Sequence, residues 1–151
     1  MAEVQTTYTT DIPVGFAGMV ANGETSNRLT RTVETAAGIG FGKAVFRGTG
    51  DHGVTATAAA NTFMGITIAK TDQPLTASRD ADEYAQYDSA AILNEGVIWV
   101  VAGEAVTDGA AAYVTSGGAI VDTATDNVAI PAVFDGTAAS GALVRLRVLR
   151  S

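Results

Sequence analysis

The sequence predicts an all-β protein, and three observations lead to that prediction. No segment of the 151 residues repeats apolar side chains at a helical spacing. Short runs rich in valine, isoleucine and threonine recur along the chain. Glycine-containing turn signals separate these runs, as at Thr107-Asp108-Gly109 and Ser116-Gly117-Gly118. We expect a β-sandwich or a jelly-roll-like barrel of roughly ten short antiparallel strands.

The chain has the length of one domain. We expect a single all-β domain over residues 1–151, with an extended N-terminal arm at residues 1–13 and a β body at residues 14–151. The arm is polar and rich in threonine, and it ends in Ile12-Pro13, where proline favours an extended preceding residue. The polar stretch near residues 71–83 is expected to be a long loop and not a domain boundary.

Residues 90–122 are expected to form the centre of the fold as an antiparallel meander. They hold the only tryptophan and the densest apolar run, Val97–Ala102. Such a run predicts a strand that is buried on both faces, with Trp99 as a core anchor. A turn is expected before it, at Asn94-Glu95-Gly96.

The other expected strands lie at residues 14–20, 28–35, 63–69, 128–134 and 142–150, and a strand pair is expected within 36–50. In the last strand, Val144, Leu146 and Val148 alternate with Arg145 and Arg147. This alternation predicts a half-buried strand at a sheet edge, with its arginines towards solvent or a partner.

Composition excludes several classes of function. The chain has no cysteine and a net charge of −7. Residues 71–140 carry eleven acidic residues and only one basic residue, Arg79, so nucleic acid is not an expected partner. No apolar run approaches the ~20 residues that span a bilayer, so no membrane partner is expected. The N-terminus has no signal-peptide pattern, so export by a cleaved signal is not expected.

No motif points to catalysis, a cofactor or a metal. The glycine-rich stretch 36–50 lacks the spacing of a phosphate-binding loop. The single histidine, His52, lies in an expected exposed turn. The acidic cluster does not have the spacing of a calcium loop, and we interpret it as solvated; its members are Asp80, Asp82, Glu83 and Asp88.

Four segments together resemble the structural cement proteins of tailed bacteriophage heads. They are RTVETAAGIGFGKAVFRGTG (31–50), FMGITIAK (63–70), YAQYDSAAILNEGVIWVVAGEAV (84–106) and IPAVFDGTAASGALVRLRVL (130–149). The sequence departs from the family pattern at Tyr87, where glycine is usual, and at residues 110–112, where a Gly-Asp turn is common. The resemblance implies a small β protein on the outer capsid surface of the virion that bridges neighbouring major capsid subunits.

Partner-binding residues are expected in two places. The arm is strand-compatible but too polar to order itself, so it is expected to extend against a neighbouring subunit; its candidates are Val4, Thr6, Tyr8 and Ile12. Arg145 and Arg147 are the candidates in the last strand. We also expect a homo-oligomer, a dimer or trimer, on the capsid.

Two other classes of function remain open. A carbohydrate-binding or adhesion module of a virion surface would need exposed aromatic residues, and Trp99 and the four tyrosines are the candidates. A hydrolase would need Asp80, Asp82, Glu83 or Asp88 to share a cleft.

Overall fold

The computed structural model describes residues 14–72 and 80–149, and these residues form eleven strands and no helix. The predicted arm lies outside the described residues. In chain order the strands are β1 (Asn27–Val33), β2 (Ile39–Gly40), β3 (Ala44–Arg47), β4 (Gly53–Thr55), β5 (Phe63–Thr67), β6 (Glu83–Tyr84), β7 (Ser89–Val101), β8 (Ala111–Val114), β9 (Ile120–Val121), β10 (Val128–Phe134) and β11 (Leu143–Val148). The all-β prediction is confirmed.

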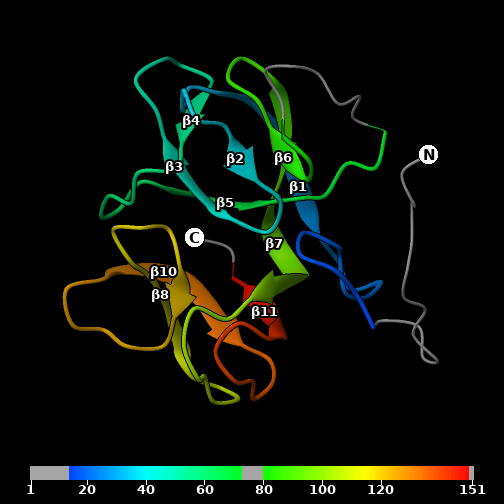
Figure 1. Cartoon of the computed structure of the whole chain (residues 1–151), viewed down its shortest axis with the longest axis vertical. Coiled ribbons are helices and arrows are strands. Elements are labelled where there is room, and N and C mark those ends of the chain that lie inside the picture. The colour runs from blue at the N-terminus through cyan, green and yellow to red at the C-terminus, as the bar shows by residue number, and fades with distance from the viewer. Residues whose placement is uncertain (1–13, 73–79, 150–151) are drawn as a thin grey trace, which may run out of the picture.

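The strands form two small closed sheets that share β7 (Figure 1). In the first sheet the order is β1-β4-β3-β5-β7, and β7 pairs back onto β1. In the second the order is β7-β11-β10-β8-β9, and a single parallel bridge from Ala102 to Ile120 closes it. All strand pairs are antiparallel except β1–β4 and this bridge. The architecture is therefore two joined five-stranded barrels.

The long strand β7 changes partners on both edges as it passes from one barrel to the other. On one edge, its residues 89–95 pair with β1, and residues 97–99 then bond to the backbone of residues 18–21. On the other edge, Ile92 and Leu93 pair with β5, and residues 96–101 then pair with β11. Gly96 lies at this change of partner with φ 131°, which favours glycine. The backbone of β7 is thus paired along most of its length.

Two groups of buried side chains fill the barrels. The first barrel encloses residues from β1, β3, β4 and β7, and the β2–β6 pair covers them with Ile39 and Tyr84; the buried set is Val33, Ile39, Val45, Val54, Tyr84, Ala90 and Ile92. A larger set fills the second barrel and continues onto the outer side of the first, where it includes Ala44, Phe46, Ile66 and Leu93. Consecutive residues of β7, Ile92 and Leu93, therefore face different cores.

Several predicted elements are corrected. Asn94-Glu95-Gly96 is not a turn but a bulged part of β7, because both neighbours continue to pair with it. The predicted strand 14–20 is a tight turn in which the Met19 amide donates to the Phe16 carbonyl (3.0 Å), and only Val20 makes a bridge. Gly18 explains this difference, because it has φ 85° and a Cβ there would approach the Ala69 nitrogen to 2.8 Å.

The predicted burial of Trp99 on β7 and the predicted edge position of β11 are also corrected. Trp99 is half-buried, not enclosed, because its indole packs under Gly15 instead of inside a barrel. The last strand is not an edge strand, because β11 lies between β7 and β10. Its alternation is confirmed: Val144, Leu146 and Val148 are buried and Arg145 is exposed.

We expect Leu93→Ala to lower the free energy of unfolding by about 2–5 kcal/mol, because it empties a fully buried site where the two barrels meet. Since β7 belongs to both barrels, circular dichroism and Trp99 fluorescence should report one coincident urea transition. Val101→Ala is the control, because Val101 lies on the same strand with 41% of its surface exposed. Separate transitions for the two probes would show that the barrels unfold independently.

We expect Tyr87→Gly to stabilise the protein. Tyr87 has φ 69° and its side chain is 77% exposed, so the change relieves the left-handed backbone and removes little buried surface. The relief of about 1–2 kcal/mol exceeds the added entropic cost of glycine, leaving a net gain of up to about 1 kcal/mol in a urea titration. Tyr87→Ala, which keeps the strain, should not stabilise. A loss of stability in the glycine variant would mean that the tyrosine ring makes a contact worth more than the strain.

Candidate functional site

Among the described residues, the side chains considered for catalysis do not form a metal-binding group. Within residues 14–72 and 80–149, no group of three or more histidine, aspartate or glutamate side chains is placed to hold a metal ion. His52 is exposed in the turn between β3 and β4, as predicted. The described chain also contains no helix with the length and apolar character needed to span a bilayer.

The acidic cluster is only partly brought together. Asp80, Asp82 and Glu83 line one hollow, where the Asp80 amide donates to Glu83 Oε1 (3.2 Å). Asp88 lies apart from the hollow, and its Oδ2 accepts from the Ala85 amide (2.9 Å). The carboxylates of Glu83 and Asp88 thus accept from loop amides, and the four acidic residues do not line one hollow.

The two predicted arginines lie on the outer side of β11 and are bonded within the chain. Arg147 makes a two-pronged ion pair with Glu24, with Nη1–Oε2 and Nη2–Oε1 distances of 2.6 and 3.1 Å. Arg145 Nε lies 3.5 Å from Asp135 Oδ2. Their binding to a partner stays a prediction. The other four candidates, Val4, Thr6, Tyr8 and Ile12, lie outside the described residues.

Three glutamates, Glu24, Glu34 and Glu104, accept hydrogen bonds from residues distant in the sequence and so hold two segments of the chain together. We call them the glutamate clamps. Glu34 accepts from the amides of Thr49 (2.9 Å) and Gly50 (2.8 Å), and these backbone hydrogen bonds hold its pKa below the ordinary value of 4.5. The hydrogen bond from Arg147 lowers the pKa of Glu24 in the same way. Hydrogen bonds from the Thr123 side chain and backbone lower the pKa of Glu104. In each case the charged form is favoured by the fold.

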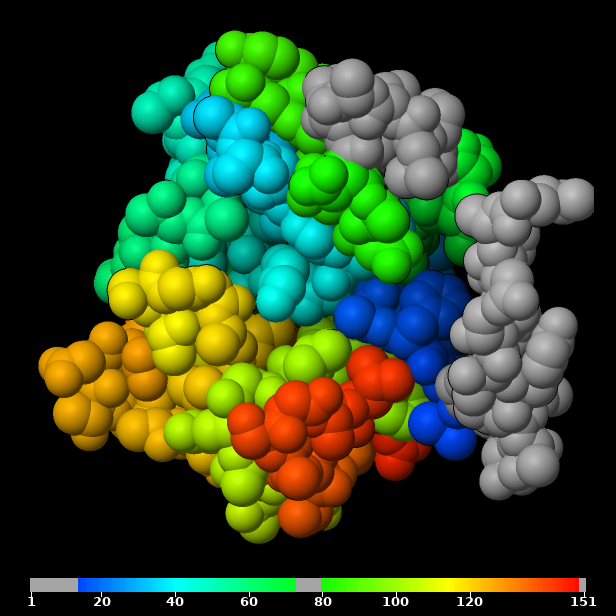
Figure 2. All heavy atoms as spheres, in the orientation of Figure 1, coloured from blue at the N-terminus to red at the C-terminus, as the bar shows by residue number. Residues whose placement is uncertain are grey.

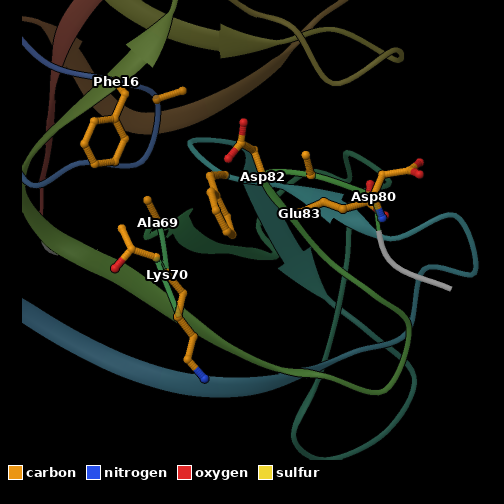
Figure 3. A pocket seen from close by; sticks show the side chains of 10 residues that line it. Phe16, Ala69, Lys70, Asp80, Asp82 and Glu83 are labelled. Carbon is orange, nitrogen blue, oxygen red and sulfur yellow. The ribbon is translucent and has the colours of Figure 1, made fainter. Parts of the chain in front are cut away.

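A hollow of about 460 Å³ lies beside the start of the described chain (Figure 3). Its apolar side is formed by Phe16, Ala17, Phe41 and Ala69. Lys70 and the acidic residues Asp80, Asp82 and Glu83 complete the rim. Phe16 is 49% exposed, and Val14, immediately before it, is 76% exposed. An apolar surface with a charged rim is typical of a protein-binding site.

A second hollow, which we call the arginine groove, has a volume of about 280 Å³ and is lined by Leu29, Arg31, Arg47, Phe63, Met64, Asn94 and Leu149. By strand alternation, Arg31 lies on the same face of β1 as Leu29, and Arg47 on the same face of β3 as Val45. Leu29 and Met64 also pack against the core of the first barrel. The groove therefore lies at the margin of that core.

Sequence reasoning missed Phe16, Arg31 and Arg47. An isolated phenylalanine between Gly15 and Gly18 was a usable signal, because glycine-flanked turns leave large side chains exposed. No sequence signal joins Arg31 to Arg47, because only the pairing of β3, β4 and β1 brings these strands together.

The described residues thus form an all-β body with hollows at its surface. The chain belongs to the phage structural cement family: the family model described as "Structural cement protein (E217 gp24/Pam3 gp6)" matches residues 4–149. Its role is therefore structural and associated with the capsid proteins of the phage virion. The family resemblance noted in the sequence is confirmed.

Two solved structures share the fold. One is described as "The capsid of Myoviridae Phage XM1", with 19% identity, a TM-score of 0.73, and coverage of 93% of this chain and 94% of that one. The other is "The crystal structure of head fiber gp8.5 N base in bacteriophage phi29", with 17% identity, a TM-score of 0.55, and coverage of 84% and 97%. No curated protein matches this sequence significantly.

The glutamate clamps predict a loss of stability in acid. Because the folded-state pKa of Glu34 lies below 4.5, its contribution is fully present above that pH and is lost as the pH falls through the lowered pKa. We expect Glu34→Gln to reduce the slope of unfolding free energy against pH below about pH 4.5, as measured by urea titration. Asp51→Asn, a neighbouring exposed acid, is the control. Identical slopes for wild type and Glu34→Gln would contradict the clamp.

Proposed function

We propose that this protein binds the outer surface of the phage head, bridges neighbouring major capsid subunits, and stabilises the shell against the pressure of packaged DNA. The observation that carries the proposal is the family match, which spans both barrels and most of the arm. The bridging role is purely mechanical and involves no covalent chemistry.

The architecture suits a mechanical clamp. A bridge transmits force between two subunits only if its own body is stiff. Here β7 passes through both barrels, and its backbone is hydrogen-bonded on both edges, so pulling the barrels apart requires disrupting that strand. Bridging also requires more than one adhesive surface. The hollow beside Phe16, which Phe41, Ala69 and Lys70 also line, and the arginine groove share no lining residue. They therefore supply two separate surfaces.

The energetics require only modest contacts. An interface that buries about 1,600 Å² supports stable docking. Contact with two subunits at once adds avidity, because the second contact forms at a high effective concentration. Repetition over the shell lattice then multiplies a small stabilisation per copy. The exposed apolar side chains of Val14 and Phe16, which follow the arm in the sequence, support an adhesive surface at the start of the body.

The arm and the copies of the protein complete the proposal. The arm, with Val4, Thr6, Tyr8 and Ile12, extends against a neighbouring subunit when the head is decorated. Copies associate as a dimer or trimer at symmetry positions of the shell. Because β11 is paired on both edges, such contacts use side chains, including Arg145 and Arg147, instead of strand pairing at that strand.

We expect deletion of residues 2–12 to leave the melting temperature of the body nearly unchanged and to weaken head decoration. The measurement is co-sedimentation of the purified protein with heads that lack it, followed by release in mild denaturant. Heads decorated by the truncated protein should also break at a lower temperature. Decoration with unchanged affinity would remove the arm from the proposed mechanism.

We expect Phe16→Ser to weaken head binding by roughly tenfold, as loss of a central apolar contact commonly does. The melting temperature should change little, because Phe16 is half exposed. Val101→Ser is the matched control, since it removes another exposed apolar side chain away from the hollow. Equal weakening by both variants would indicate a nonspecific effect of surface polarity.

A further inference from the structure

The arginine groove contains two guanidinium groups that have no carboxylate partner among the described residues. Arg31 Nη1 donates to the Thr30 carbonyl (2.9 Å), which uses one of its five donors. Arg47 is exposed, and neither arginine belongs to an ion pair within the described chain. By contrast, Arg145 and Arg147 on β11 both have acidic partners.

The lining of the groove differs in charge from the protein as a whole. The full sequence has a net charge of −7, so an average stretch of its surface would be acidic. Instead, the groove lining holds two arginines, one asparagine and no acid. Leu29, Met64 and Leu149 supply apolar walls beside the charges, and Leu149 is 44% exposed. A guanidinium group next to an apolar wall is well suited to bind a carboxylate, because the partly desolvated site strengthens the paired hydrogen bonds.

We propose that the arginine groove docks an extended, acidic segment of the shell protein. Its carboxylates would pair with Arg31 and Arg47, and its apolar side chains would lie against Leu29, Met64 and Leu149. This inference rests on the proposed function and specifies one of its contact sites. A shell segment is favoured because the proposed function already sets shell protein against this body, and two arginines beside apolar walls complement a chain that carries both carboxylates and apolar side chains.

The groove also favours a segment over a folded surface. Its volume of about 280 Å³ accommodates a few side chains. Its lining comes from β1, β3, β5, β7 and the residue after β11, so the walls are held by strands of both barrels. Such a recess admits an extended chain with alternating acidic and apolar side chains, because these point to opposite sides of a strand.

The main test is binding of Arg31→Gln/Arg47→Gln to heads that lack the protein, measured by co-sedimentation over a range of salt concentrations. We expect affinity to fall by roughly tenfold or more at low salt, and the salt dependence to become shallower, because two charge pairs are lost. Arg28→Gln is the matched control. It removes one positive charge from the strand that holds Arg31, half the change of the double variant, and Arg28 is exposed and does not line the groove.

A second measurement uses the isolated protein. Capped peptides of alternating glutamate and leucine, and of glutamine and leucine, are titrated while amide chemical shifts are recorded. We expect the glutamate peptide to shift residues of β1, β3 and β5 in wild type but not in the double variant. The glutamine peptide should have little effect.

The possible results distinguish failure of the groove proposal from failure of the proposed cement function. Wild-type and double-variant binding with equal affinity and salt dependence would overturn the groove and leave the cement proposal intact. Loss of self-association in sedimentation velocity, with head binding unchanged, would assign the groove to a second copy and also overturn the inference. Failure of the wild type itself to bind heads would overturn the proposed function, whatever the peptide result.

Discussion

The structure depends on hydrogen bonding along both edges of β7. A strand that served only one barrel would leave the other with an open sheet. Because β7 has thirteen residues, it is long enough to complete both. Its bulge at residues 94–96 turns the strand between the two sets of partners, and Gly96 accepts the backbone conformation that this requires. Residues 18–21 then occupy the edge that β1 leaves.

This arrangement also explains why the cores are continuous. Ile92 faces the interior of the first barrel, while Leu93 packs with residues that fill the second. Phe46 and Ile66 extend that second core onto the outer side of the first barrel. The protein thereby buries more apolar surface than two separate small barrels could, which matters because much of its hydrophobic content is alanine. In Figure 2 the two halves form one continuous body.

Much of this fold follows from local sequence. The strand 128–134 and the alternation of Val144, Leu146 and Val148 were predictable from local sequence. Short apolar runs and alternating apolar residues directly indicate strands and the face that each side chain occupies. The segment Asn94-Glu95-Gly96 was misread because its residues are those of a turn, and only tertiary pairing keeps it extended. Trp99 was misplaced for a similar reason: a large apolar residue predicts burial, but its packing under Gly15 depends on a turn far away in sequence.

The candidate site was less predictable than the fold. Arg145 and Arg147 could be placed on an outer face by alternation, but their acidic partners Asp135 and Glu24 could not be identified. The arginine groove joins residues from four strands and the residue that follows β11, so it exists only after the chain has folded. Interaction surfaces of this kind carry no fixed residue spacing, in contrast to metal or phosphate motifs.

Closing both sheets also affects the tendency of the protein to aggregate before it joins the shell. An open β edge presents a row of unpaired amides and carbonyls, which can template the addition of another chain. A shell component is needed in many copies, so such an edge would promote aggregation at the concentrations at which it accumulates. The two ring closures, β7 onto β1 and Ala102 onto Ile120, remove the edges that the longest sheet would otherwise expose. Within the described residues, the contacts that we propose between the body and the shell would then use side chains and not these strand edges.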